Sequence, residues 1–154
     1  MKRSVVYTLK AFIAFFGAIV LAMAAWGLPA IANENTEWYP EFAHLKLPLI
    51  LFGEVALIAA LGFLICIWAL LSRVREDKIF DESSIQWVRA MTFTPAFGAV
   101  ACGGAVFFTP GPPALNIAEI LAALACLALT LLLVVMRGLL EQASSLRSEL
   151  DVVI

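Results

Sequence analysis

The chain has 154 residues, of which 63% are hydrophobic and 14% are charged, and its formal net charge is −2. Soluble domains average roughly 45–50% apolar and about 25% charged residues, so this composition excludes an ordinary water-soluble globular protein. It predicts a protein of the lipid bilayer, with little chain left for a separate soluble domain.

Four apolar segments reach the length of about 20 residues that a membrane-spanning helix needs. They are residues 11–31, 47–71, 91–109 and 114–136. We therefore expect an all-α fold, an integral membrane four-helix bundle that forms a single membrane domain over residues 1–154. The expected location is the bacterial cytoplasmic membrane, as a multi-pass protein.

The basic residues predict the orientation of these spans. Nine of the ten Lys and Arg residues lie before the first span, between the second and third, or after the fourth. Because short cytoplasmic connections carry an excess of Lys and Arg, we predict cytoplasmic N- and C-termini, a cytoplasmic hairpin at 72–90 and a cytoplasmic tail at 137–154. The two remaining connections face outward.

The first span has one alternative interpretation. Met1-Lys2-Arg3, an apolar run and the triplet Ala30-Ile31-Ala32 are also typical of a secretory signal with its cleavage site. The apolar core of a signal has about 7–15 residues, whereas this run continues for about 20, which favours a retained span. We expect that span to end at Gly27-Leu28-Pro29. Pro40 and Pro48 are expected to keep the next connection non-helical as well.

Two acids lie inside predicted spans. Glu54 is in the second span and Glu119 in the fourth, each near the outer end. A charge at the centre of a membrane helix costs on the order of 2.5–3.5 kcal/mol, so each acid should face the bundle and have a partner or a proton. A proton- or cation-binding pair is one hypothesis, and a hydrogen bond to Asn116, a Thr or the backbone is the other and the favoured one.

The third span contains a proline and a stripe of small residues. Pro95 removes a backbone hydrogen bond near the cytoplasmic end, and Thr92 and Thr94 could cap the freed carbonyls. Gly98 and Cys102 belong to a four-residue repeat of small residues that lets helix backbones approach closely. Similar repeats occur in the first and fourth spans, and they would serve either packing within the bundle or a homo-oligomer.

Cofactor and metal sites are not expected. Cys66, Cys102 and Cys126 lie in three different spans, with no Cys-x-x-Cys pair and no neighbouring His. The single His, His44, stands apart from them, so the chain lacks the ligand spacing of a metal site.

The cytoplasmic segments carry the candidate interaction residues. In the hairpin, Asp81 is placed to cap the next helix and Phe80 to pack against that helix. In the tail, apolar residues at 139, 143, 146, 150 and 153 recur at spacings of four and three, which is typical of a heptad seam. This seam could lie on the membrane, fold against the hairpin or bind a cytosolic protein.

Several short motifs resemble a known family. They are Leu28-Pro29-Ala30-Ile31-Ala32-Asn33-Glu34, Tyr39-Pro40-Glu41, the loop from Lys78-Ile79-Phe80-Asp81 to Ser84, and the ending from Leu146 to Val153. In these the chain resembles the domain of unknown function 2975 family of small bacterial membrane proteins. The resemblance implies four spans and a gene neighbour that encodes a helix-turn-helix transcription regulator. The chain departs from the family at Glu54, where relatives carry an uncharged residue, and at Val152-Val153-Ile154, where a Thr is common.

We therefore expect a non-enzymatic membrane protein that regulates or binds a cytosolic transcription regulator through its hairpin and tail. The expected partner contacts are Phe80, Asp81, Leu146, Glu149 and Asp151. The alternatives are a small proton-coupled transporter that uses Glu54 and Glu119, and an accessory subunit of a larger membrane complex. Direct nucleic-acid binding is not expected, because acids interrupt the basic residues and no recognition motif accompanies them.

Overall fold

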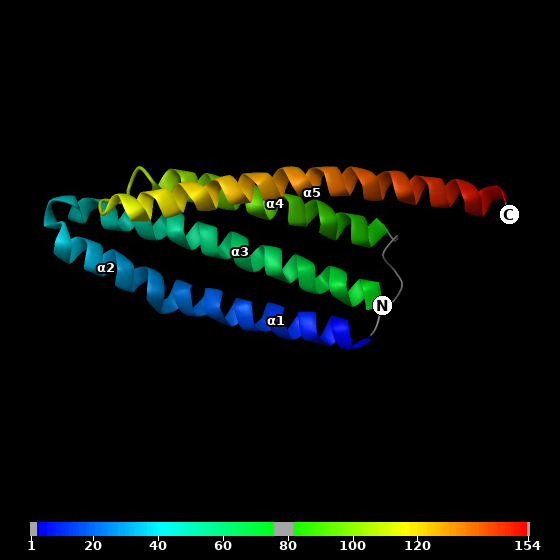
Figure 1. Cartoon of the computed structure of the whole chain (residues 1–154), viewed down its shortest axis with the longest axis horizontal. Coiled ribbons are helices and arrows are strands. Elements are labelled where there is room, and N and C mark those ends of the chain that lie inside the picture. Colours follow the sequence, from blue (N-terminus) through cyan, green and yellow to red (C-terminus); the bar gives the residue numbers. More distant parts are fainter. Residues whose placement is uncertain (1–2, 76–81, 154) are drawn as a thin grey trace.

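A computed structural model describes residues 3–75 and 82–153 of the chain. Over these residues it is helical almost throughout, and they form no strand. Figure 1 shows the helices lying along one common axis, with the C-terminal helix extending beyond the others. The predicted all-α membrane bundle is confirmed.

The helices follow one another with short connections. They are α1 (Arg3–Ala22), the π-helical turn η1 (Met23–Gly27), α2 (Leu28–Trp38), the 3-10 helix η2 (Pro40–Leu45), α3 (Lys46–Arg75), α4 (Glu82–Ala105) and α5 (Pro113–Val153).

The first helix does not end where the sequence predicted. α1, η1 and α2 follow one another without interruption to Trp38, so the prediction of a break at Gly27-Leu28-Pro29 is wrong. In a regular α-helix the ring of Pro29 would clash with a carbonyl one turn earlier. Here Leu28 donates its backbone N–H to the carbonyl of Met23, five residues back. This wider π turn changes the backbone path just before the proline, so the helix continues.

The connection between α2 and α3 is also more helical than predicted. Pro40 begins η2 and Pro48 lies in the first turn of α3. A proline is tolerated in a first turn because its missing N–H would have no partner inside the helix there. The segment that leads into and through this connection carries exposed aromatic side chains, with Trp26 83% and Trp38 75% exposed. Such residues suit the membrane–water interface.

Helices α3, α4 and α5 approach one another through small residues. A Cβ added at Gly98 of α4 would lie 3.3 Å from Sγ of Cys126 in α5 and 4.0 Å from Cβ of Ala59 in α3. A larger residue would therefore push the helices apart, as expected for a small-residue contact in a membrane. By contrast, Ala118 and Ala122 of α5 are exposed.

The carbonyl freed by Pro95 is satisfied by one of the two predicted threonines. Thr94 donates its hydroxyl to the carbonyl of Met91 at 3.1 Å, which is the carbonyl that the missing N–H of Pro95 leaves without a helical partner. Thr92 donates instead to the carbonyl of Val88 at 2.9 Å, which Pro95 does not free, so the predicted role of Thr92 is wrong. α4 continues through the proline.

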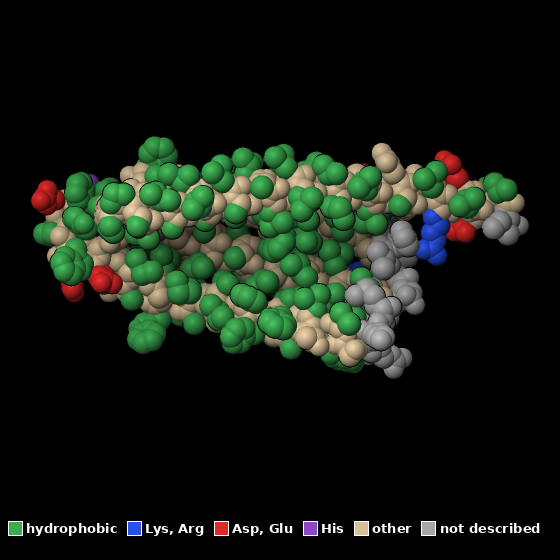
Figure 2. All heavy atoms as spheres, in the orientation of Figure 1, with side chains coloured by type: hydrophobic (Ala, Val, Ile, Leu, Met, Phe, Trp, Pro, Cys, Tyr) green, Lys and Arg blue, Asp and Glu red, His purple; other side chains and the backbone are tan. Residues whose placement is uncertain are grey.

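The helices pack in a series instead of closing into a ring. α1 packs on α3, α3 on α4 and α4 on α5, and within the described ranges no Cα atom of α1 lies within 8 Å of α4 or α5. The buried apolar cluster is accordingly small and consists of Val6, Ile13 and Leu71. Most large apolar side chains are exposed, and Figure 2 shows them covering the middle of the molecule, with a hollow between the α5 side and the α1 side. Surfaces of this kind are suited to contact with lipid.

Three helical segments in the described ranges have the length and hydropathy of membrane spans, namely Ser4–Trp38, Pro40–Val74 and Pro113–Val153. α4 has 24 residues, which is long enough, but its first third is polar. It lies between α3 and α5 and buries Thr92, Pro95 and Gly98 against them, whereas Phe93, Phe97 and Val100 on its other side are exposed. A fourth crossing by α4 stays a prediction.

Candidate functional site

The end of the molecule that holds the C-terminal part of α5 carries three of the five residues predicted to bind a partner. α5 is 41 residues long, which corresponds to about 61 Å at about 1.5 Å per residue, twice the hydrocarbon thickness of about 30 Å. Figure 1 shows α5 extending past the ends of α3 and α4. Leu146, Glu149 and Asp151 are all exposed on this extension.

Polar contacts fasten the neighbouring helix ends together. Lys10 of α1 donates to Oγ of Ser72 in α3 at 2.8 Å, and its Nζ lies 5.1 Å from the centre of the Trp68 ring. Arg73 of α3 donates from Nη1 to Oγ of Ser83 in α4. These contacts link the ends of α1, α3 and α4 at the end of the molecule from which the tail of α5 projects.

The hairpin residues Phe80 and Asp81 lie outside the described residues. α4 begins at Glu82, the position immediately after Asp81. The roles of Phe80 as a packing residue and of Asp81 as a cap therefore stay predictions.

Charge is distributed unequally between the two ends. Figure 2 shows acidic side chains at the end formed by α2 and η2, and basic side chains together with acids at the end formed by the tail of α5. Within the tail, Arg137 and Glu141 form an ion pair of 2.8 Å between Nε and Oε1. An exposed pair at this spacing is worth only about 0.3–0.5 kcal/mol, so it supports the helix slightly and leaves the remaining tail acids for other contacts.

The intramembrane acid of α5 is tied to the end of α4. Oγ1 of Thr109 lies 2.7 Å from Oε1 of Glu119 and 2.9 Å from the carbonyl oxygen of Ala105. Thr109 is buried, and the adjacent Phe108 stacks on Phe52 of α3 with ring centres 5.3 Å apart. This arrangement joins the first part of α3, the end of α4 and the first part of α5, and the hydrogen bond between Thr109 and Glu119 is of the kind that the favoured hypothesis anticipated.

Other polar atoms near this joint are buried without a partner among the described residues. They are Nδ2 of Asn35, Oδ1 of Asn116 and Oε2 of Glu119. Groups of this kind are commonly satisfied by ordered water. The sequence pattern singled out Glu119 and Asn116 but gave no sign that Asn35 would be buried.

The second intramembrane acid, Glu54, lies in α3. The structure records no hydrogen bond or ion pair for it among residues 3–75 and 82–153. α3 and α5 have no Cα atoms within 8 Å of each other, so α4 stands between Glu54 and Glu119. No group of three or more His, Cys, Asp or Glu side chains that could hold a metal ion occurs in the part of the chain that the structure describes.

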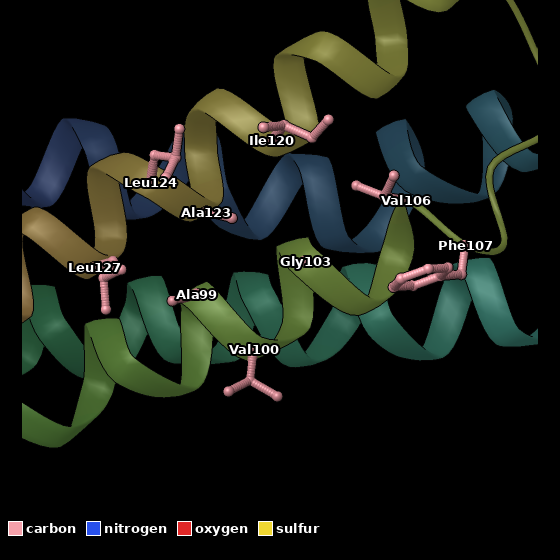
Figure 3. A pocket seen from close by; sticks show the side chains of 9 residues that line it. All are labelled: Ala99, Val100, Gly103, Val106, Phe107, Ile120, Ala123, Leu124 and Leu127. Atoms are coloured by element: carbon pink, nitrogen blue, oxygen red, sulfur yellow. The ribbon is translucent and has the colours of Figure 1, made fainter.

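A groove between α4 and α5 has a volume of about 480 Å³. Figure 3 shows its lining, which includes Val100 and Gly103 from α4, Phe107 from the turn that follows α4, and Ile120 and Leu124 from α5. Every lining residue is apolar or glycine, so the groove suits a hydrocarbon chain or an apolar side chain and offers no polar group for catalysis or for a charged ligand.

These features define the class of the chain, which is a multi-pass α-helical membrane protein whose last helix, α5, extends beyond the other helices. The chain belongs to the family described as protein of unknown function (DUF2975), which matches residues 30–154. It is also similar to the uncharacterized membrane protein YoaS of Bacillus subtilis (strain 168), with 22% identity over 160 residues and all of both chains covered. No solved structure matches the chain. Neither the family description nor the name of the relative states an enzymatic activity.

Proposed function

We propose that the chain is a non-enzymatic, membrane-embedded interaction protein that binds a cytosolic protein through its hairpin at 72–90 and its tail at 137–154. The length of α5 is the observation that carries the proposal. A helix that only crossed the membrane would need about 20 residues, and α5 has 41, of which the last two and a half heptads or so are exposed.

The charges of the tail support a role in binding. Glu149 and Asp151 lie in the last two turns of α5, and no basic residue lies in its last turn. Acids near a helix C-terminus oppose the helix dipole by roughly 0.3–1 kcal/mol each. Acids that destabilise the end of a helix are expected where the surface they form serves a function such as binding. Exposed carboxylates there would attract a partner with a basic surface.

A helix-turn-helix regulator has the matching chemistry. Proteins that bind DNA carry clustered Lys and Arg that neutralise phosphates, and such a surface is complementary to the acids at the end of α5. The resemblance to the family implies such a regulator as a gene neighbour. Binding of the regulator at the membrane would then compete with its binding to DNA, because both use the same basic residues.

The proposal can be tested by capture of the regulator from cytosol on membranes that contain the full chain. A variant with Glu149→Lys and Asp151→Lys should retain at least severalfold less regulator than the native chain. Glu141→Lys is the matched control, because it reverses one charge on the same helix at a site that is paired with Arg137 and lies nearer the membrane. Equal retention by the double variant, the control and the native chain would contradict the proposed surface.

A further inference from the structure

α5 has a continuous apolar face that no other described helix covers. In the tail it includes Leu139, Leu146 and Leu150, which are 55%, 60% and 64% exposed. These positions belong to the series with alternating spacings of four and three, and the same spacing continues back through Met136 and Leu132 to Ala118. The seam, defined as this series from Ala118 to Val153, therefore runs from the outer end of the span to the end of the tail.

The seam is distinct from the face of α5 that packs on α4. Cys126 and Leu133 point toward the bundle, where Leu133 is buried and Cys126 meets the Gly98 position of α4. At 100° per residue, the seam lies roughly 70° around the helix from these positions within the span and roughly 130° from them in the tail. Leu129 of the seam is partly buried and its other positions are exposed, so the seam borders the face that α5 uses for its own fold and leaves most of its length unoccupied.

Residue size is sorted around the exposed part of α5. Between Ile117 and Ala125, the seam positions are Ala118, Ala122 and Ala125, whereas the exposed residues outside the seam are Ile117, Ile120, Leu121 and Leu124. Lipid contact alone would place large and small side chains without this order. Alanines at spacings of four and three let a second helix approach closely inside a membrane.

The area of the seam decides which occupant it fits. From Leu139 to Val153 it is about 21 Å long, and with a helix width of about 10 Å a partner would bury roughly 400 Å² in total, which is the size of an incidental contact. From Ala118 to Val153 it is about 52 Å long, and the same width gives roughly 1,000 Å², the lower limit for a specific interface. A suitable occupant must therefore cover the tail and the span together.

We infer that this occupant is a second copy of the chain, which pairs in parallel along the seam. The bilayer fixes both copies in the same orientation, so their α5 helices run in the same direction and each seam residue meets its own counterpart. Alanine then faces alanine in the outer half, where close approach is needed. Leucine faces leucine in the tail, where burial from water adds a hydrophobic contribution. The seam holds no charged residue, so pairing brings no like charges together.

Pairing would leave the acids of the tail available to a cytosolic partner. Glu149 lies beside the seam and Asp151 lies outside it, so two paired tails would present these carboxylates twice. Ser145 and Ser148 occupy the positions farthest from the seam. The inferred pairing does not rest on the proposed function, because it concerns only copies of this chain.

The test uses disulfide formation in lipid vesicles that contain the purified full chain and no cytosolic protein. Cys66, Cys102 and Cys126 are first replaced by alanine, and single cysteines are then introduced as Leu146→Cys or Leu150→Cys. Ser145→Cys and Ser148→Cys are the controls, since they lie in the same two turns and differ from the native residue by one atom. Disulfides need Cα atoms within about 7 Å, so the seam variants should form severalfold more covalent dimer on oxidation than the controls.

Two results would overturn the pairing. One is equal dimer formation at seam and control positions, which would indicate random collision, and the other is no dimer at either seam position. A further pair of variants tests the span in the Leu146→Cys background. Ala122→Trp should block close approach and lower the dimer yield severalfold, whereas Leu131→Trp, which places the same large side chain outside the seam, should not. If capture of a regulator fails while the seam variants still form dimers, only the proposed function is lost.

Discussion

The adjacent glycines of α4 offer a sharp test of how the outer ends of the helices pack. A Cβ added at Gly104 would lie 2.5 Å from Cε1 and 2.9 Å from Cδ1 of Phe52. A Cβ added at Gly103 would meet nothing within 4 Å. The two positions share one helix and one residue type, so they differ in packing and not in helix propensity.

The expected cost of Gly104→Ala follows from this contact. The ring of Phe52 has to move, and it is held by its stack with Phe108 at 5.3 Å. Adding a methyl group to a filled contact typically costs about 1–3 kcal/mol. Replacing Gly by Ala inside a helix returns about 0.5–1 kcal/mol at either position. Gly103→Ala should therefore be neutral or stabilising, and Gly104→Ala should be less stable than Gly103→Ala by about 1–3 kcal/mol.

The measurement is equilibrium unfolding of the purified chain in mixed micelles of increasing denaturing-detergent content. The fluorescence of its four Trp residues can report unfolding. Phe52→Leu provides a second check, because a smaller, flexible side chain should reduce the penalty of Gly104→Ala while losing the aromatic stack, worth about 0.5–1.5 kcal/mol. If Gly104→Ala proves as stable as Gly103→Ala, the close approach of α3 and α4 at this level is refuted.

Three further predictions concern individual polar groups and the orientation. Thr94→Val should lower the free energy of unfolding by about 1 kcal/mol in the native chain. The loss should be clearly smaller in a Pro95→Ala background, where the restored N–H of residue 95 satisfies the carbonyl of Met91. Equal losses in the two backgrounds of this double-mutant cycle would show that Thr94 does not satisfy that carbonyl. Thr109→Val should cost about 1–3 kcal/mol, because it leaves both carboxyl oxygens of Glu119 without a protein donor, whereas Glu119→Gln keeps a hydrogen-bonding group and should cost less in the same unfolding assay. A cysteine at Ser145 should react with a membrane-impermeant thiol reagent only after inverted vesicles expose the cytoplasmic side, and reaction from the outside would reverse the predicted topology.

The class of fold could be predicted from the sequence because a membrane imposes a strong requirement on composition and on the length of apolar segments. Local chemistry could be predicted as well where both partners lie close together in the sequence. Thr94 sits beside Pro95 and satisfies the carbonyl that the proline frees. The bond between Thr109 and Glu119 joins residues ten apart across a short connection, and a Thr partner was among the expected alternatives.

The path of the first helix could not be predicted in the same way. Pro29 and Pro95 are the same residue type inside apolar segments, yet only Pro29 is accommodated by a π turn. That turn depends on the backbone conformation of the five preceding residues, which composition does not specify.

The order in which the helices pack on one another could not be predicted from the sequence either. In a soluble helix, polar residues mark the exposed face, but in a membrane both faces are apolar and periodicity no longer separates lipid contacts from helix contacts. The sequence therefore identified the small residues Gly98 and Ala118 alike, although only Gly98 meets neighbouring helices.

The position of α4 between α3 and α5 has a consequence for how the protein enters the membrane. On the four-span topology, residues 91–109 cross the membrane, and this segment, with Thr92, Thr94, Pro95 and three glycines, lacks the hydropathy of the other three spans, so it leaves the translocon for lipid less readily than they do. The apolar segment that follows, α5, has to be synthesised before α4 is secured. The two helices then enter the lipid together as one helical hairpin. A ribosome stalled before α5 is synthesised would leave α4 on the cytoplasmic side.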